Sequence, residues 1–279
     1  MNSYFKHGFL GLAFFVLLAC DDTQKDTHHD PHHMHFAEGT VRVGVLLGSA
    51  EEELLEKAKK IAAQTYDMHI IIVPYRYMSE INQSLSDHKI DANFFQYPAY
   101  LDYSEKKYGY HLVSMGETYV YPMGVYSKKI HNILELHQRS SIAIPNEPTN
   151  EARALFLLEK AGLIRMKSDT NMIATTNDIL SNPHDFEFKK LSSDEILDAL
   201  PNVDIALINA GFALTAGLTP SKDALVIENI NANYANVLVT REDEKDQLQL
   251  KALIEILRSP AVSNVANEIF KGDAIPAWK

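Results

Sequence analysis

An aromatic stretch, Asp91-Ala-Asn-Phe-Phe-Gln-Tyr-Pro-Ala-Tyr100, contains the residue types best suited to holding a small apolar molecule. Residues 90–95 are apolar enough to form a strand, and the proline that follows ends it. The rings of Phe95, Tyr97 and Tyr100 then lie at the carboxyl end of that strand, where open α/β sheets bind ligands. Because ligand pockets are lined mainly by apolar and aromatic side chains, we interpret this stretch as one wall of a binding cleft. The alternative is that these rings pack in the core.

Residues 146–153, Asn-Glu-Pro-Thr-Asn-Glu-Ala-Arg, lie between an expected strand and an expected helix and indicate a second wall. If Thr149 is the N-cap, unpaired amides of the first helical turn lie at the mouth of the cleft. Arg153 follows about one turn into the helix, and a guanidinium can bind a carboxylate through two hydrogen bonds. A helix N-terminus and an arginine together favour an anionic group. The alternative is an exposed arginine that pairs with a neighbour such as Glu147.

Two asparagines could contribute to the same cleft. Asn209 ends the expected strand at 203–208, and Asn236 lies in an extended segment near the end of the chain. Their amides could form hydrogen bonds with the polar ends of a ligand. Either asparagine could equally be a turn residue.

The sequence argues against catalysis and against nucleic-acid binding. It contains no HExxH, GxSxG or P-loop pattern, so we expect neither an enzyme nor a cofactor. The formal net charge of −11 disfavours nucleic acid, whose phosphates need clustered Lys and Arg. The histidines of the folded part lack the spacing of metal ligands. They are His69, His88, His111, His131, His137 and His184.

The elements that must position these residues form two runs of alternating strands and helices, the pattern of sheets covered by helices. The first run comprises strands 41–47, 69–75 and 90–95 and helices 50–66, 78–85 and 97–108. The second run comprises strands 141–145, 186–191, 203–208 and 224–227 and helices 150–161, 193–200 and 211–217. Extended segments at 113–126 and 236–240 flank the second run, and helices at 244–258 and 260–270 close the chain.

Because two extended segments flank the second run, we expect the chain to pass twice between two lobes. The folded part is also long enough for two cores of ordinary size. We assign residues 41–122 and 240–279 to lobe 1 and residues 123–239 to lobe 2. Such a layout makes a two-lobed clamp with a hinge.

Residues 1–20 have the features of a secretory signal. A charged start precedes the apolar run 8–19, which is too short to span a bilayer. The run ends in Leu17-Leu18-Ala19-Cys20, which resembles a bacterial lipobox, whose cysteine is acylated and becomes the new N-terminus. We therefore expect a protein anchored by lipid at Cys20 to the cell envelope, on the periplasmic side of a bacterial membrane. The alternative is an ordinary signal followed by a chance cysteine.

Residues 21–40 contain almost nothing apolar to bury, and we expect a flexible tether between the lipid and the folded part. Within the tether lies a histidine-rich tract, and neutral imidazoles bind zinc, copper or nickel. The tract contains His28, His29, His32, His33 and His35. It would either capture a metal ion such as zinc or serve only as a solvated linker.

Several of these motifs together resemble the NlpA/MetQ family, the methionine-binding lipoproteins of ABC importers. They are the lipobox, Asp91-Ala-Asn-Phe-Phe-Gln, Ile144-Pro-Asn-Glu-Pro-Thr-Asn150 with Arg153, Ile208-Asn209 and Tyr234-Ala-Asn236-Val-Leu-Val. The resemblance covers residues 41–278. It implies an α/β, two-lobed periplasmic-binding-protein fold, type II-like, with two mixed sheets and a hinge crossed twice. It also implies that the lobes close on methionine and deliver it to an ABC permease and its ATPase.

Carried over to matching positions, the resemblance implies an aromatic cage of Phe95 and Tyr100 and a carboxylate-binding Arg153. It further implies two ligand-binding asparagines, Asn209 and Asn236. The whole predicted ligand-binding set is Tyr77, Met78, Phe95, Tyr97, Tyr100, Asn150, Arg153, Asn209 and Asn236.

The chain departs from the family pattern at two of these positions. The family usually has His where this chain has Tyr97, and Tyr where Met78 stands, with Tyr77 one position away. Both changes touch the pocket for the ligand's side chain. They leave L-methionine, D-methionine, a methionine-containing dipeptide and another apolar amino acid open as ligands. A metal-capturing lipoprotein that uses the histidine tract is the alternative function.

If the tract captures metal, deleting residues 28–35 should remove high-affinity zinc binding, because only these clustered imidazoles have the composition of a metal site. Zinc titration of the chain with and without these residues checks the prediction. Methionine binding should survive the deletion. Equal zinc affinities would remove the metal-capture hypothesis.

Overall fold

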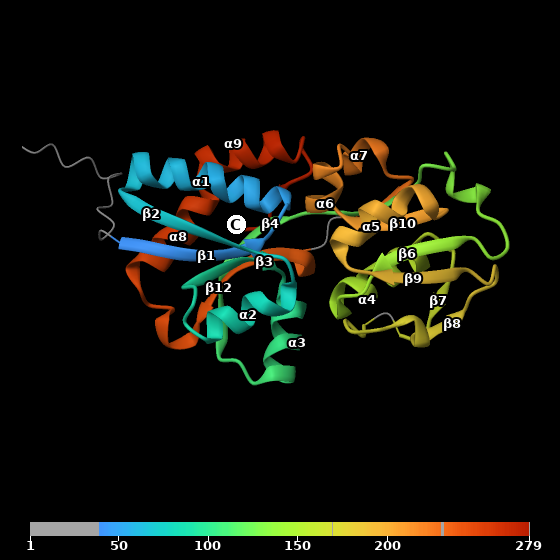
Figure 1. Ribbon diagram of the computed structural model, residues 1–279, viewed down its shortest axis with the longest axis horizontal. Helices are drawn as coiled ribbons and strands as arrows, with labels where there is room; N and C mark the ends of the chain where they lie inside the picture. Colours follow the sequence, from blue (N-terminus) through green and yellow to red (C-terminus); the bar gives the residue numbers. More distant parts are fainter. Residues whose placement is uncertain (1–38, 169, 230–231, 279) are drawn as a thin grey trace, which may run out of the picture. The chain divides into compact units, whose positions relative to one another are not determined.

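The computed structural model describes residues 39–168, 170–229 and 232–278, all of which belong to one compact unit, His35–Lys279. The signal segment with Cys20, the histidine tract and nearly all of the tether lie outside the described residues. The described residues form two mixed β-sheets with covering helices (Figure 1).

The first sheet has six strands in the order β13-β4-β12-β3-β1-β2. Its strands are β1 (Gly39–Leu46), β2 (Met68–Tyr75), β3 (Ala92–Gln96), β4 (Leu112–Val120), β12 (Ala235–Arg241) and β13 (Ile275–Pro276). Strands β1, β2 and β3 are parallel, whereas β12 runs antiparallel to both β3 and β4. The helices associated with this sheet are α1 (Ala50–Tyr66), α2 (Met78–Ser86), α3 (Pro98–Tyr108), α8 (Leu248–Arg258) and α9 (Pro260–Ile269).

The second sheet has five strands in the order β11-β5-β10-β6-β9. Its strands are β5 (Met123–Tyr126), β6 (Ser141–Pro145), β9 (Glu187–Leu191), β10 (Ile205–Asn209) and β11 (Val226–Ile227). Its helices are α4 (Pro148–Lys160), α5 (Ser193–Ala199), α6 (Ala210–Thr215) and α7 (Pro220–Asp223). A separate ribbon pairs β7 (Arg165–Met166) with β8 (Ile179–Ser181). Short 3₁₀ segments occur at Ile133–Glu135, Thr176–Asp178, Leu200–Asn202, Ala232–Tyr234 and Glu242–Glu244.

The chain passes between the two sheets twice. The first passage is short, because β4 ends at Val120 and β5 begins at Met123. The second passage runs from the end of β11 to Ala235, which pairs with Val120. Both passages therefore meet the first sheet at the same place. The sequence analysis set the second lobe boundary at residue 239, and strand pairing here puts residues 235–241 in the first sheet.

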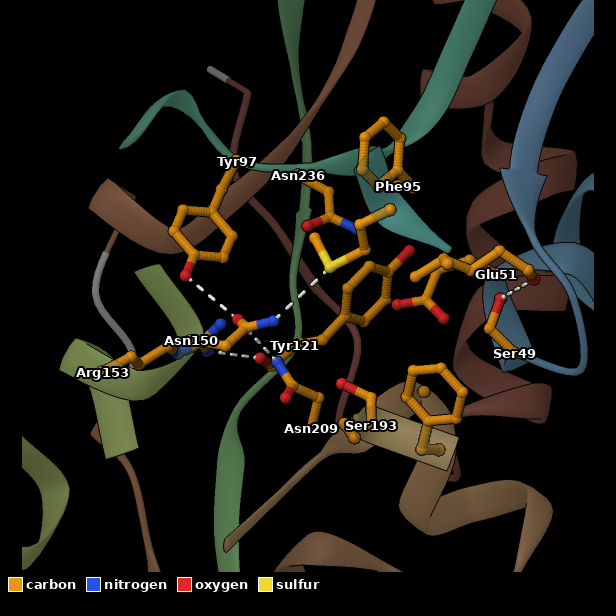
Figure 2. Close-up of a pocket in the computed structure, with 15 residues that line it drawn as sticks. Ser49, Glu51, Phe95, Tyr97, Tyr121, Asn150, Arg153, Ser193, Asn209 and Asn236 are labelled. Atoms are coloured by element: carbon orange, nitrogen blue, oxygen red, sulfur yellow. Dashed lines mark hydrogen bonds between the residues drawn. The ribbon is translucent and has the colours of Figure 1, made fainter. Parts of the chain in front are cut away.

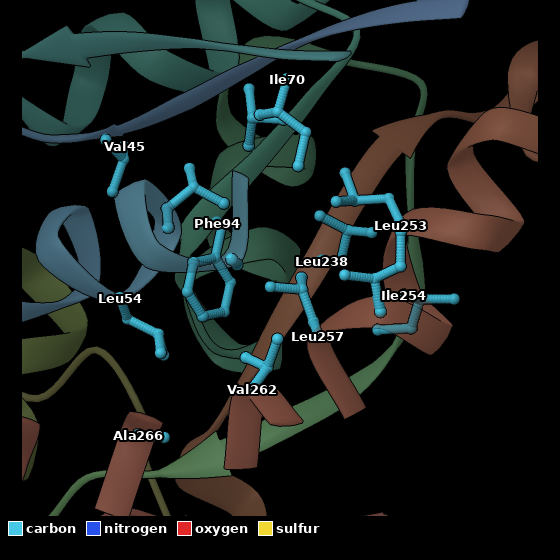
Figure 3. Packing of buried hydrophobic residues seen from close by; sticks show 14 of the residues in the cluster. Val45, Leu54, Ile70, Phe94, Leu238, Leu253, Ile254, Leu257, Val262 and Ala266 are labelled. Atoms are coloured by element: carbon cyan, nitrogen blue, oxygen red, sulfur yellow. The ribbon is translucent and has the colours of Figure 1, made fainter. Parts of the chain in front are cut away.

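Helices cover both faces of the first sheet. On one face, α1, α8 and α9 bury a cluster that includes Leu54, Phe94 and Leu253 (Figure 3). On the other face, α2 and α3 belong to a second cluster, which continues into the second lobe through residues such as Ile208 of β10 and Phe212 of α6. Apolar packing thus joins the two lobes next to the passages.

Local sequence explains most helix ends, with one exception. Helix α1 has the predicted bounds, because the Ser49 side chain accepts from Glu52 N and an acidic first turn suits the helix dipole. The prediction that Thr149 caps α4 is wrong. The N-cap is Glu147, and Pro148 occupies the first helical position, which its fixed φ favours. The penultimate helix also begins later than predicted, at Leu248, after a 3₁₀ turn.

Three amide side chains form a closed hydrogen-bond network between α2 and β3. Asn82 Nδ2 donates to Gln96 Oε1 at 3.0 Å, and Asn82 Oδ1 accepts from Asn93 Nδ2 at 2.9 Å and from Gln96 Nε2 at 2.7 Å. Gln96 Nε2 also donates to Asn93 Oδ1 at 2.8 Å, and all three residues are fully buried. The network ties α2, which begins at Met78, to β3, which contains Phe95.

Replacing Asn82 by alanine should lower the free energy of unfolding by about 1–3 kcal/mol, because it leaves Asn93 Nδ2 and Gln96 Oε1 without their partner in the interior. Urea denaturation measures the loss. The exposed neighbour Gln83 provides the control, since Gln83→Ala should stay within about 0.5 kcal/mol of the parent. Equal losses in the two variants would contradict a stabilising network.

Candidate functional site

A cavity of about 40 Å³ lies between the two sheets, room for a few water molecules at about 10–15 Å³ each (Figure 2). Both lobes contribute to its lining, and Tyr121 of the first passage does as well. The lining residues are Leu46, Ser49, Glu51, Met78, Phe95, Tyr97, Tyr121, Asn150, Arg153, Ser193, Asn209, Ala210, Gly211, Phe212 and Asn236. The cavity lies at the carboxyl ends of β1, β3, β6 and β10, the position at which α/β sheets bind ligands.

The structure brings seven of the nine predicted ligand-binding residues to this cavity. They are Met78, Phe95, Tyr97, Asn150, Arg153, Asn209 and Asn236. Tyr77 is 51% exposed, and Tyr100 packs edge-to-face behind Phe95 with ring centroids 5.7 Å apart. Both of these tyrosines line a wider outer pocket, which shares Met78 and Phe212 with the inner cavity.

Strand alternation explains why only some of the aromatic residues reach the cavity. Successive side chains of β3 point to opposite faces, so Phe94 packs in the core beneath α1 while Phe95 faces the cleft. The next ring, Tyr97, is the N-cap residue of α3, where the chain turns out of the strand. Burial raises the pKa of Tyr97 above its ordinary value, so its hydroxyl stays protonated and can donate.

Arg153 is the only arginine among the described residues of the cavity lining, and it is 3% exposed. Its Nε and Nη2 donate to the carboxylate of Glu228 at 3.0 Å and 2.6 Å, and Nη2 also donates to the carbonyl of Tyr121 at 2.8 Å. The rings of Tyr97 and Tyr234 lie 5.4 Å and 4.3 Å from its guanidinium carbon. Among the described residues, Nη1 has no hydrogen-bond acceptor. The guanidinium is thus fixed on one edge, and its other edge is available to an anion.

The predicted alternative for Arg153, an exposed side chain paired with Glu147, is wrong. Glu147 instead accepts from the amide and hydroxyl of Ser193. Burial by itself would lower the pKa of Arg153, but the adjacent charge of Glu228 outweighs that effect and raises it, so the guanidinium stays charged.

Asn150 connects the lobes at the centre of the cavity. Its Oδ1 accepts from the Tyr97 hydroxyl of lobe 1 at 3.1 Å and from Asn209 Nδ2 of lobe 2 at 3.3 Å. Its Nδ2 donates to the sulfur of Met78 at 3.8 Å. Among the residues that the structure describes, the buried hydroxyl of Tyr121 and Oδ1 of Asn209 have no hydrogen-bond partner. Polar groups left unpaired in a cavity lined by both lobes are suited to binding a polar ligand.

Glu51, Tyr121 and Glu228 were not predicted from the sequence. Glu51 follows the carboxyl end of β1, the end of a strand at which ligands bind, but three glutamates in the first turn of a helix are explained equally well by the helix dipole. Burial raises its pKa to about 7, and hydrogen bonds to its own amide and to Ser49 offset only part of that rise. Nothing local marks Glu228, because its partner Arg153 lies in another element of the fold.

Within residues 39–168, 170–229 and 232–278, no helix is long and apolar enough to cross a membrane. The same ranges contain no group of three or more His, Cys, Asp or Glu residues able to hold a metal ion.

Comparisons with known proteins give consistent results over the whole folded part. The model of the family described as NlpA lipoprotein matches residues 41–278. D-methionine-binding lipoprotein MetQ of Salmonella typhi is 38% identical over 269 residues, which cover 96% of this chain and 95% of the relative.

Two solved structures extend the similarity to the fold. One is an ABC transporter periplasmic substrate-binding protein from Coxiella burnetii, with 45% identity, a TM-score of 0.81 and coverage of 85% of this chain and 100% of that chain. The other is a nutrient-binding protein from Burkholderia cenocepacia bound to methionine, with 35% identity, a TM-score of 0.82 and coverage of 85% and 100%. The predicted fold class, an α/β periplasmic-binding-protein fold with two mixed sheets, is confirmed.

Ionisation of Glu51 should destabilise the folded protein. Its folded-state pKa of about 7 exceeds the ordinary 4.5, so between these values the folded state keeps a proton that the unfolded state releases. Stability therefore falls as the pH rises through this range and is lowest above it. Glu51→Gln should add roughly 1–3 kcal/mol at pH 8 and almost nothing at pH 4, as measured by thermal unfolding at both pH values. A gain of the same size at both would contradict this account, and the exposed Glu53→Gln is the control.

Proposed function

Because this chain belongs to the NlpA lipoprotein family, we propose that it is the substrate-binding lipoprotein of an ABC importer and captures methionine, in its L or D form, or a close relative. The ligand would be held between the two lobes and delivered to the permease and its ATPase. The observation that carries the proposal is the cavity between the sheets, in which a buried arginine faces aromatic and thioether side chains.

Proteins of this family bind a substrate and do not convert it, so the chain is a binding protein and not an enzyme. The predicted lipid anchor at Cys20 would keep it at the membrane that contains the permease. A polypeptide confined to that surface meets its transporter at a high local concentration, which suits a protein that transfers a ligand.

The arginine edge supports recognition of the ligand's carboxylate. Nη1 of Arg153 would donate to it, while Glu228 and the Tyr121 carbonyl keep the guanidinium oriented. Amide groups of Asn209 and Asn236 line the same cavity and would pair with the remaining polar atoms. A positioned, desolvated cation binds a carboxylate more strongly than an exposed one does.

The apolar side of the cavity supports recognition of the thioether. Phe95 and Tyr97 come from lobe 1 and Phe212 from lobe 2, with Met78 beside them. Each contact between a methionine sulfur and a ring contributes about 0.3–1.5 kcal/mol. An unbranched side chain can also adapt to this irregular surface, which a branched residue would fill less well.

Contact with both lobes would couple binding to closure. Ligand atoms between Phe95 of lobe 1 and Arg153 of lobe 2 interact fully only when the lobes are together, so the ligand favours the closed arrangement. Because the space between the lobes is now about 40 Å³, methionine requires the lobes to separate or side chains such as Asn150 to rearrange before it enters.

Replacing Arg153 by alanine should weaken methionine binding by about 2–5 kcal/mol, because the buried carboxylate loses its charged partner. Calorimetric titration of L- and D-methionine into parent and variant measures the change. Arg139→Ala is a matched control, since Arg139 pairs with Glu187 on the surface, and it should leave the dissociation constant nearly unchanged.

Arg153→Ala also leaves Glu228 without its partner, so the double variant Arg153→Ala, Glu228→Gln should be titrated alongside it. The double variant removes both charges and avoids a lone buried carboxylate. Undiminished methionine affinity in the folded double variant would exclude the proposed role of Arg153. A parent protein that binds neither isomer would exclude the proposed ligand.

A further inference from the structure

Glu51 is the charged group of the cavity that the proposed function leaves unused. It lies in the first turn of α1, directly after the carboxyl end of β1. Its two acidic neighbours have other surroundings: Glu52 accepts from the amide of Gly48 at 2.6 Å, and Glu53 is exposed. Of the three glutamates, only Glu51 lines the cavity, and its side chain is turned toward the cleft (Figure 2).

The Glu51 carboxylate has no cationic partner within the described part of the chain. Two other inward-facing carboxylates have such a partner: Glu228 pairs with Arg153 at 2.6 Å and Glu151 with Lys190 at 2.5 Å. Because Glu228 already balances Arg153, the negative charge of Glu51 is left over in the cavity lining. A carboxylate shielded from water without a counter-charge is costly, and such groups are concentrated at sites that bind a charged ligand.

The second lobe is shaped to accommodate this carboxylate. Gly211, near the start of α6, has no side chain, and a Cβ there would lie 2.1 Å from Glu51 Oε2. The carboxylate of lobe 1 therefore lies directly against the backbone of lobe 2. Any larger residue at position 211 would push Glu51 away from the cavity.

Two unpaired acceptors lie in the same lining. The Tyr121 hydroxyl is buried without a partner in the described part of the chain, and so is Oδ1 of Asn209. Glu51 and Tyr121 both line this cavity (Figure 2). Tyr121 also connects both charged residues, since its carbonyl accepts from Arg153. A carboxylate, a hydroxyl and an amide oxygen match the three N–H donors of an ammonium group.

We propose that Glu51, together with the Tyr121 hydroxyl and Asn209 Oδ1, binds the ammonium group of the ligand. The cleft then accepts only ligands with a free amine and rejects those whose nitrogen is absent or acylated. This assignment rests on the proposed binding of an amino acid and adds a second determinant of specificity, opposite in charge to Arg153. The ligand supplies the counter-charge that Glu51 lacks in the protein.

The test compares methionine with 4-(methylthio)butanoate, which has the same chain and carboxylate but lacks the amine. Calorimetric titration of both into the parent should show a preference of about 100-fold or more for methionine. Glu51→Gln should weaken methionine binding about 10- to 100-fold and leave binding of the butanoate nearly unchanged, so that the preference shrinks. Glu53→Gln, in the same turn, should keep the parental preference.

Tyr121→Phe, which removes only the hydroxyl, is the second variant. It should also reduce the preference, by a smaller factor than Glu51→Gln, because it removes a neutral acceptor. If Glu51 had a purely structural role, Glu51→Gln would weaken the binding of methionine and of the butanoate by the same factor. A preference for methionine that stays unchanged in folded Glu51→Gln would overturn the assignment. If the parent binds neither methionine nor the butanoate, the proposed function itself is wrong, which is a different outcome from the failure of Glu51.

Discussion

The structure depends on a buried positive charge where the two lobes meet. The guanidinium of Arg153 is removed from water, and a buried charge is tolerated only when it is paired and hydrogen-bonded. Its partners come from the two passages between the sheets: the Tyr121 carbonyl from the first and Glu228 from the second. One ion pair thus ties α4 of the second lobe to both connecting segments, so the position of the charge and the course of the hinge depend on each other.

Around this charge, the lining has a polar side and an apolar side that come from different parts of the fold. The first lobe contributes Phe95 on β3, the strand that the buried amide network ties to Asn82 of α2. The second lobe contributes Arg153 from α4 and Asn209 at the end of β10. Glu51 adds a negative charge from α1, so the cavity contains groups of both signs. Such an arrangement suits a zwitterion with an apolar side chain better than a simple anion or cation.

Local features were predictable from the sequence, and long-range partners were not. The bounds of α1 follow from its Ser49 cap, its apolar stripe and its acidic first turn, all of which lie within a few residues of each other. The Thr149 cap was mispredicted because a proline next to it competes for the first helical position. Seven predicted site residues lie at the cavity because the carboxyl ends of β1, β3, β6 and β10 all face it. The pairing of Arg153 with Glu228 could not be read locally, since it arises only once the second passage returns beside α4.

The most direct measurement is a crystal structure of residues 39–279 with bound methionine. Our account predicts the ligand in the cavity between the sheets, with its carboxylate within hydrogen-bond distance of Arg153 Nη1 and its thioether against Phe95. Methionine bound outside this cavity, or with its carboxylate turned away from Arg153, would contradict the account.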